Sequence, residues 1–239
     1  MGKAVLIGAG PGAADLITVR GARILSQASV VLYDALVGQD ILDLCPNAIK
    51  IPVGKRFGQR STAQAAINVQ LVELARNHAL VVRLKGGDPM LFGRADEELA
   101  ALEQAGIEVE VVPGISTAFA AAAATLQPLT KRGCARSVAF FTSSSAPDLP
   151  DTTQLPDSDT LVQYMGGQKA LQTAELLLAQ GRSVDLPVLV VENCSLPNQR
   201  IWRMTLSDLK LGLPECSGPV LVMIGEAFAA RHTTSFPQV

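Results

Sequence analysis

Short apolar runs alternate with helix-like segments along this chain, and this alternation constrains the fold more than any other feature. In the first half, runs rich in β-branched residues occur at residues 5–7, 29–34, 48–53, 80–85 and 109–112. Segments with a helical spacing of apolar residues lie between them, at residues 13–28, 61–77 and 94–105. Strands that alternate with helices are typical of a mostly parallel sheet covered on both faces. The first half therefore predicts a complete small α/β domain.

The second half repeats this organisation after a Pro113-Gly114 joint. Strand candidates lie at residues 137–142, 160–165, 187–192, 201–205 and 220–224, and helix candidates at 118–124 and 169–180. Only a short polar loop separates Glu192 from Ile201, which indicates an antiparallel hairpin. We therefore expect an α/β fold of two domains, residues 1–113 and 114–239. Each should contain a mixed, mostly parallel five-stranded sheet flanked by helices.

Composition excludes several classes of protein. The formal net charge of −2 gives no electrostatic basis for nucleic-acid binding. The four cysteines are far apart in the sequence and form no Cys-x-x-Cys pair, so we expect no protein-built zinc site and no metal. No run of 18 or more apolar residues suggests a membrane span, and the first residues lack a signal-peptide layout. We expect a cytoplasmic protein with no membrane partner.

One stretch, from Val81 to Arg94, combines a predicted strand with a turn of unusual composition. The apolar run ends in Gly86-Gly87-Asp88-Pro89, and a helical pattern follows. Such a turn places backbone without side chains, together with one carboxylate, at the carboxyl end of a strand. Open α/β proteins bind small ligands at that end of the sheet. It is equally consistent with a loop that uses Asp88 as a structural cap. This stretch alone does not decide between the two.

A glycine-rich loop follows the first predicted strand. Gly8-Ala9-Gly10-Pro11-Gly12-Ala13 fits the dinucleotide pattern G-x-G-x-x-G/A, and Asp34 lies where a ribose-binding acid is expected. The pattern is consistent with a flavin or NAD oxidoreductase, with another nucleotide site, or with a structural connection. A flavin enzyme gives no reason for the second turn at residues 86–89.

Two basic clusters lie in the two predicted domains. The first contains Lys55, Arg56 and Arg60, and the second contains Lys131 and Arg132. Such clusters are usually solvated surface. Alternatively, they bind carboxylates or phosphates, for which arginine supplies paired donors. One cluster in each domain would suit a polyanionic substrate.

Taken together, these segments resemble one family. Those that carry the resemblance occur in the family's order, at residues 5–12, 31–37, 53–56, 83–94, 112–115, 128–138 and 161–166. They are similar to the tetrapyrrole (class III) S-adenosylmethionine-dependent methyltransferases, over nearly the whole chain. The resemblance implies two α/β domains with a cleft between them, a homodimer, and S-adenosylmethionine as co-substrate. The N-terminal domain would supply the substrate side and part of the cofactor site, and the C-terminal domain the rest.

The resemblance also assigns roles to individual residues. It implies that Asp34 is the proton acceptor and Lys55 the proton donor. The positions that match cofactor contacts are Pro11, Gly86, Gly87, Asp88, Leu91, Ser116, Thr117, Met165 and Cys194. Arg56, Arg60, Lys131 and Arg132 become candidates for binding the acetate and propionate groups of a tetrapyrrole.

Several positions depart from the family pattern, among them residues 93–98 and Lys131, where the family often has histidine. Ala13 stands where the first loop usually has an acid, and Cys194 stands where the family has a glycine near the adenosine. The segments 53–56 and 128–133 favour members that methylate uroporphyrinogen III at carbons 2 and 7, giving precorrin-2 for sirohaem or cobalamin. A methyltransferase for another precorrin or for diphthine remains an alternative, as does an oxidoreductase that uses the first glycine loop.

Overall fold

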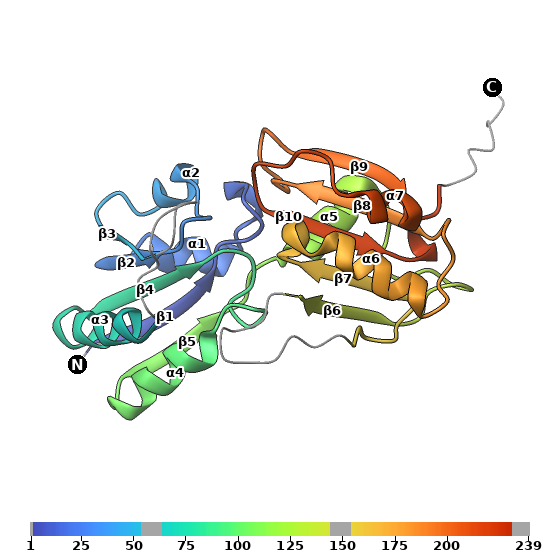
Figure 1. The fold of residues 1–239 in the computed structure, drawn as a ribbon. Helices are drawn as coiled ribbons and strands as arrows, with labels where there is room; N and C mark the ends of the chain where they lie inside the picture. Colours follow the sequence, from blue (N-terminus) through green and yellow to red (C-terminus); the bar gives the residue numbers. More distant parts are fainter. Residues whose placement is uncertain (1, 54–63, 144–153, 231–239) are drawn as a thin grey trace, which may run out of the picture. The chain divides into compact units, whose positions relative to one another are not determined.

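The computed structural model describes residues 2–53, 64–143 and 154–230. The chain divides into two compact units, Met1–Ala120 and Ala121–Val239, each with a five-stranded sheet (Figure 1). The predicted α/β class is therefore confirmed. The domain boundary predicted between Pro113 and Gly114 stays a prediction.

The first unit is built on a parallel sheet. Its strands are β1 (Lys3–Gly8), β2 (Val30–Tyr33), β3 (Ile49–Pro52), β4 (Leu80–Lys85) and β5 (Glu108–Val112). They lie in the order β3-β2-β4-β1-β5, and every neighbouring pair is parallel. The carboxyl ends of these strands consequently meet at one edge of the sheet.

Helices cover both faces of this sheet because successive strand residues point to opposite sides. Val5 and Ile7 pack with residues of α1 (Val19–Leu25) and α2 (Gln39–Leu42). Ala4 and Leu6 face the other way and pack with α3 (Gln64–Asn77) and α4 (Ala95–Gln104). Both faces are apolar, as expected for a parallel sheet inside an α/β layer.

The helix predicted at residues 13–28 is wrong in its extent. A 3₁₀ turn occupies Ala14–Leu16, and α1 begins only at Val19. Thr18 is the N-cap, since its hydroxyl accepts a hydrogen bond from the backbone N–H of Gly21 (3.1 Å). A threonine before an apolar run is a recognised start signal, so the sequence contained the information that places this helix correctly.

The second unit carries a mixed sheet. Its strands are β6 (Val138–Thr142), β7 (Thr160–Tyr164), β8 (Pro187–Glu192), β9 (Arg200–Thr205) and β10 (Val220–Ile224). They lie in the order β6-β7-β10-β8-β9, and only β6 and β7 are parallel neighbours. The predicted hairpin is confirmed, because β8 and β9 pair antiparallel from Pro187 with Thr205 to Glu192 with Arg200.

Two helices of the second unit cover one face of this sheet. Residues of α6 (Ala170–Ala179) and α7 (Leu206–Leu211) join Leu161, Val190 and Val222 in one apolar core. The sequence reading missed α7. It starts with a capping box, in which Thr205 and Asp208 each bind the other's backbone N–H. The Thr-x-x-Asp spacing could have identified it.

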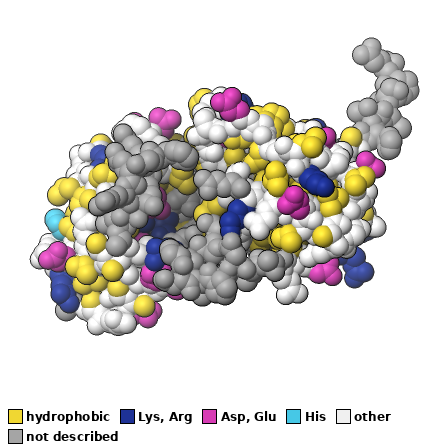
Figure 2. All heavy atoms as spheres, in the orientation of Figure 1, with side chains coloured by type: hydrophobic (Ala, Val, Ile, Leu, Met, Phe, Trp, Pro, Cys, Tyr) yellow, Lys and Arg dark blue, Asp and Glu magenta, His cyan; other side chains and the backbone are white. Residues whose placement is uncertain are grey.

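The surface shows no large region of one charge on the face seen in Figure 2, where basic and acidic side chains of described residues are interspersed. Within residues 2–53, 64–143 and 154–230, no helix has both the length and the apolar character needed to cross a membrane.

Candidate functional site

The carboxyl edge of the first sheet collects most of the predicted site residues of that unit. Asp34 follows β2, and the Gly86-Gly87-Asp88 turn follows β4, the neighbouring strand. Pro11 lies in the loop after β1, and Ser116 in the segment after β5. Strand order therefore places these groups in one row, although they are spread over more than 80 positions of sequence.

The chain leaves this edge in opposite directions at β1 and β4. These strands are neighbours, yet α1, which follows β1, covers one face, and α4, which follows β4, covers the other. In open α/β sheets, ligands bind where neighbouring strands diverge in this way. Pro11 and the 86–88 turn flank this point.

The first glycine loop is joined directly to the second turn. The backbones of Gly10 and Gly87 exchange hydrogen bonds, at 3.2 Å from Gly10 N to Gly87 O and 2.7 Å from Gly87 N to Gly10 O. Gly114 lies so close that a Cβ there would be 2.3 Å from the carbonyl oxygen of Gly87. The first loop thus supports the second turn. Because α1 does not begin until Val19, the loop does not open a helix as the dinucleotide fingerprint requires.

Asp88 fastens this turn to the segment after β5. Its Oδ1 accepts from the backbone N–H of Met90 (2.8 Å), and its Oδ2 accepts from that of Gly114 (2.9 Å). The side chain is half-buried. A carboxylate has about four lone-pair positions, so two bonds leave acceptor capacity for a ligand. Asp88 thus caps the turn structurally and is still a candidate for contact with a ligand, so the two interpretations of the sequence do not exclude each other.

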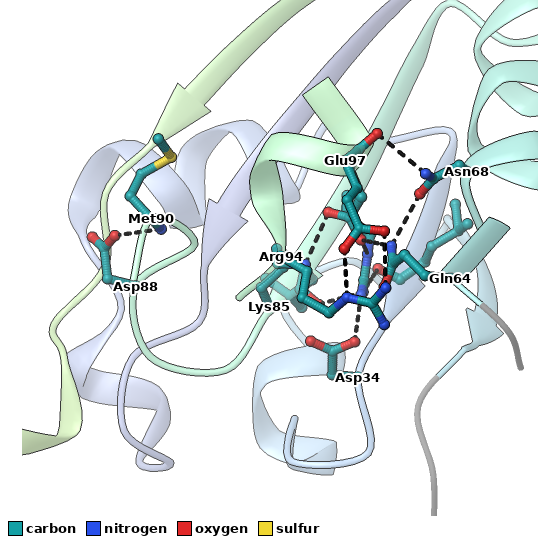
Figure 3. A network of polar contacts seen from close by, with 12 residues as sticks. Asp34, Gln64, Asn68, Lys85, Asp88, Met90, Arg94 and Glu97 are labelled. Carbon is teal, nitrogen blue, oxygen red and sulfur yellow. Dashed lines mark hydrogen bonds and ion pairs between the residues drawn. The ribbon is translucent and has the colours of Figure 1, made fainter. Parts of the chain in front are cut away.

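A buried ion network lies behind Asp34 and was not anticipated from the sequence. Arg83 and Lys85 alternate along β4 and point toward α4. Both reach Glu98, with 2.8 Å from Arg83 Nε to Oε1 and 2.9 Å from Lys85 Nζ to Oε2. The guanidinium of Arg83 also donates to Asp34 Oδ1. Figure 3 labels Asp34 and Lys85 among the residues drawn around this network. The network therefore connects β4, α4 and the end of β2.

Burial and neighbouring carboxylates have opposite effects on the pKa values of the two cations in this network. Arg83 is 2% exposed, Lys85 3% and Glu98 0%. Desolvation, followed by the neighbouring Arg83 charge, lowers the pKa of Lys85. Burial alone would also lower the pKa of Arg83, but Asp34 and Glu98 together raise it. A charge inside an apolar strand requires a partner, so Arg83 and Lys85 within the run at 80–85 were the signal that sequence reasoning overlooked.

Asp34 is held on one side only. Arg83 occupies its Oδ1, whereas for Oδ2 the described residues provide no hydrogen-bond donor. The side chain is 30% exposed. Among the described residues the carboxylate is therefore fixed in orientation with one oxygen not engaged, which suits a group that accepts a proton from a substrate.

Two predicted cofactor residues lie at the same end of the second sheet. Since β7 and β8 both run antiparallel to β10, their carboxyl ends share one edge of the sheet. Met165 directly follows β7, and Cys194 lies two residues beyond β8. Met165 has a left-handed backbone (φ 54°) and is exposed. Cys194 is buried, and burial raises the pKa of its thiol to about 11.

Of the remaining predicted site residues, some lie within the part of the chain that the structure describes and others do not. Lys131 and Arg132 are exposed on a tight turn, closed by two 2.9 Å backbone bonds between residues 131 and 135. Leu91 follows Asp88 and is half-buried, and Thr117 begins α5 (Thr117–Thr125). Lys55, Arg56 and Arg60 lie outside the described residues. Within the described ranges, no group of three or more His, Cys, Asp and Glu residues is arranged to hold a metal.

Comparison with known proteins gives consistent matches. The family of Tetrapyrrole (Corrin/Porphyrin) Methylases matches residues 3–210. Siroheme synthase 1 of Pectobacterium atrosepticum is 44% identical over 235 residues, which is 97% of this chain and 49% of that protein. Siroheme synthase of Zymomonas mobilis is 44% identical, over 98% of this chain and 51% of that protein. The chain thus spans about half the length of these relatives.

Solved structures match over more of their length. Native uroporphyrin III C-methyltransferase from Thermus thermophilus has a TM-score of 0.83 and 38% identity, covering 95% of this chain and 93% of that one. The same enzyme complexed with S-adenyl homocysteine has a TM-score of 0.81 and 39% identity, with 95% and 98% covered. A cobalt precorrin-4 methyltransferase has a TM-score of 0.79 and 29% identity, with 95% and 96% covered.

The buried ion network predicts a large stability difference between two adjacent glutamates. Replacing Glu98 with Gln leaves Arg83 and Lys85 without the carboxylate that they share, and should lower the free energy of unfolding by about 3–5 kcal/mol. Glu97→Gln is the matched control, because Glu97 pairs with Arg94 at the surface. That change should cost less than about 1 kcal/mol. Urea unfolding followed by circular dichroism measures both, and equal losses would contradict the role assigned to Glu98.

Proposed function

Because the chain belongs to the family of tetrapyrrole (corrin/porphyrin) methylases, we propose that it transfers methyl groups from S-adenosylmethionine to uroporphyrinogen III. The methylated positions are carbons 2 and 7, and the product is precorrin-2, for sirohaem or cobalamin. The structural observation that carries the proposal is the pairing of two features on neighbouring strands. Asp34 follows β2 and has one carboxylate oxygen that no described residue engages, and the Gly86-Gly87-Asp88 turn follows β4, the neighbouring strand.

The turn at residues 86–88 fits the co-substrate. Gly87 has a φ of +68°, and a Cβ built there would meet no atom within 4 Å. The backbone is therefore open on that side and can be approached closely. Asp88 adds a carboxylate that could accept hydrogen bonds from ribose hydroxyls or from the ammonium group. Pro11, Leu91, Ser116, Thr117, Met165 and Cys194 are the other proposed cofactor contacts.

The chemistry requires little of the protein beyond alignment and proton removal. When bound, S-adenosylmethionine supplies an already activated methyl group on a sulfonium. Holding the reacting carbon in line can contribute about 7–11 kcal/mol. Asp34 then accepts the proton that the substrate loses after methyl transfer, while Arg83 keeps its carboxylate in place. Lys55 either donates a proton or binds substrate carboxylates.

The substrate's acidic side chains would be bound by the two basic clusters. Lys131 and Arg132 are exposed at the tip of their turn and are available for acetate and propionate groups. Arg56 and Arg60 are proposed for the same role. We further propose a homodimer in the cytoplasm, as the family resemblance implies.

The reaction itself is the direct test. Incubation with S-adenosylmethionine and uroporphyrinogen III should yield a product heavier by two methyl groups in mass spectrometry. No methylated uroporphyrinogen product although the cofactor binds, or methylation only of a later precorrin or of diphthine, would reassign the chain to a sibling activity. Failure to bind S-adenosylhomocysteine in calorimetry would remove the proposed function altogether.

Asp34→Asn tests the proton acceptor. Asparagine can still accept the Arg83 hydrogen bond, so the fold and the affinity for S-adenosylhomocysteine should be retained. Loss of the base should lower kcat by about 10²–10⁴-fold. Asp40→Asn is the control, because Asp40 is exposed at the start of α2. Unchanged turnover of Asp34→Asn would refute the assignment.

Asp88→Ala tests the turn. This change removes a ligand acceptor and both internal hydrogen bonds, so S-adenosylhomocysteine should bind at least about tenfold more weakly. Asp96→Ala, an exposed position in the first turn of α4, is the control. Titration calorimetry gives both dissociation constants, and a wild-type value for Asp88→Ala would show that its carboxylate is dispensable.

A further inference from the structure

A second buried carboxylate, Glu192, lies at the end of β8 and is not used by the mechanism above. Its side chain is completely shielded from solvent. Oε1 accepts from the backbone N–H groups of Ser217 (2.6 Å) and Gly218 (2.7 Å). Oε2 accepts from Arg200 Nε (2.6 Å). One carboxylate thus joins the end of β8, the start of β9 and the segment before β10.

The group that Glu192 holds in place is the loop Asn193–Gln199. Glu192 and Arg200 are paired across the β8–β9 ladder, so their ion pair closes the base of this loop. The N–H of Asn193 donates to Pro219 O (3.1 Å), and that of Ser195 donates to Gln199 Oε1 (2.7 Å). The loop is therefore fixed at both ends and internally.

The backbone of this loop is strained in a way that requires support. Asn193 and Ser195 have left-handed φ values of 49° and 64°. The Asn193 side chain also lies directly on Gly218, where an added Cβ would be 1.9 Å from Asn193 Oδ1. Non-glycine residues in left-handed backbone persist where the surroundings over-determine them, and they cluster at ligand sites. Cys194, the proposed adenosine contact, lies between these two residues.

We propose that Glu192 is a positioning residue that shapes the loop Asn193–Gln199 to receive the adenosine part of S-adenosylmethionine. This inference rests on the proposed function. A hairpin loop could be closed by apolar residues at no cost of burying charge. The structure instead has a buried anion that directs three donors, and those donors fix where the backbone around Cys194 lies. The Arg200 hydrogen bond, followed by the Gly218 and Ser217 amides, lowers the pKa of Glu192 to about 2, so the anion persists at neutral pH.

The chain contains its own reporter for this arrangement. Trp202 is its one tryptophan, and the Arg200 guanidinium lies 5.0 Å from the centre of the Trp202 ring. Releasing Arg200 from Glu192 should change the surroundings of that ring. Tryptophan fluorescence of the ligand-free protein therefore measures the state of the ion pair independently of activity.

Glu192→Gln is the test, with S-adenosylhomocysteine as the probe. Glutamine has nearly the same shape but carries no charge and has only one acceptor oxygen. We expect altered Trp202 emission, a dissociation constant at least about tenfold higher, and a raised KM for S-adenosylmethionine with kcat within about threefold of wild type. Asp157→Asn is the control, because it breaks an exposed pair with Arg182 in the same unit. Its affinity should stay within about twofold of wild type.

The outcomes separate the inference from the proposed function. If wild type binds the probe and Glu192→Gln binds it equally well, Glu192 only stabilises the fold, and the inference is wrong while the function stands. If wild type does not bind the probe, the proposed function fails. Should Glu192→Gln not fold, Arg200→Lys decides, since it keeps the charge but loses the planar donor geometry. Weaker probe binding by this variant supports the inference, and wild-type affinity overturns it.

Discussion

The buried contact of Glu98 with Arg83 and Lys85 is the interaction on which the first unit depends. Two cations enter an otherwise apolar strand, and the cost of removing them from water is offset only if a carboxylate meets both. Helix α4 supplies that carboxylate, so its position on β4 is fixed by charge as well as by packing. Arg83 then has a donor left for Asp34. The network therefore has two roles. It joins α4 to the sheet, and it orients the proposed catalytic carboxylate of Asp34 at the end of the neighbouring strand.

At the end of β1, close contact between backbones holds the loops in place, as the ion network does at the end of β2. The Gly10–Gly87 hydrogen bonds and the approach of Gly114 to Gly87 bring three loops to van der Waals distance. A side chain at Gly114 would clash with the carbonyl oxygen of Gly87 and separate these segments, and Asp88 could then not reach the N–H of Gly114. The first glycine loop, which by pattern resembles a nucleotide site, is in this structure a support for the second turn. The loop resembles a dinucleotide fingerprint because both need glycines, which let other groups approach the backbone closely. In this structure the approaching group is another protein segment.

The sequence predicted the strands, the helices α3 and α4 and the strand-end location of Asp34 and the 86–88 turn, because these follow from local patterns and from the geometry of parallel sheets. It gave no sign of the short helix α2. It did not predict what depends on contacts between distant segments. Arg83 and Lys85 read as part of an apolar run, and only the packing of α4 shows that Glu98 faces them. The start of α1 and the existence of α7 were missed although Thr18 and Thr205 signal both. The antiparallel character of the second sheet depends on β10, which enters between β7 and β8 from the far end of the chain.

Both units use a carboxylate–arginine ion pair to fix the position of groups at the end of a strand. In each, a buried carboxylate is bonded to an arginine near a proposed functional group. Arg83 joins Glu98 to Asp34, and Glu192, paired with Arg200, lies two residues before Cys194. Methyl transfer from a sulfonium needs accurate placement more than strong acid or base chemistry. Fixed charges suit that need, because charge-assisted hydrogen bonds are directional and short, whereas apolar packing alone leaves loop backbones free to shift. On this argument both ion pairs are retained for the precision they give to strand-end loops, and their net contribution to stability is secondary.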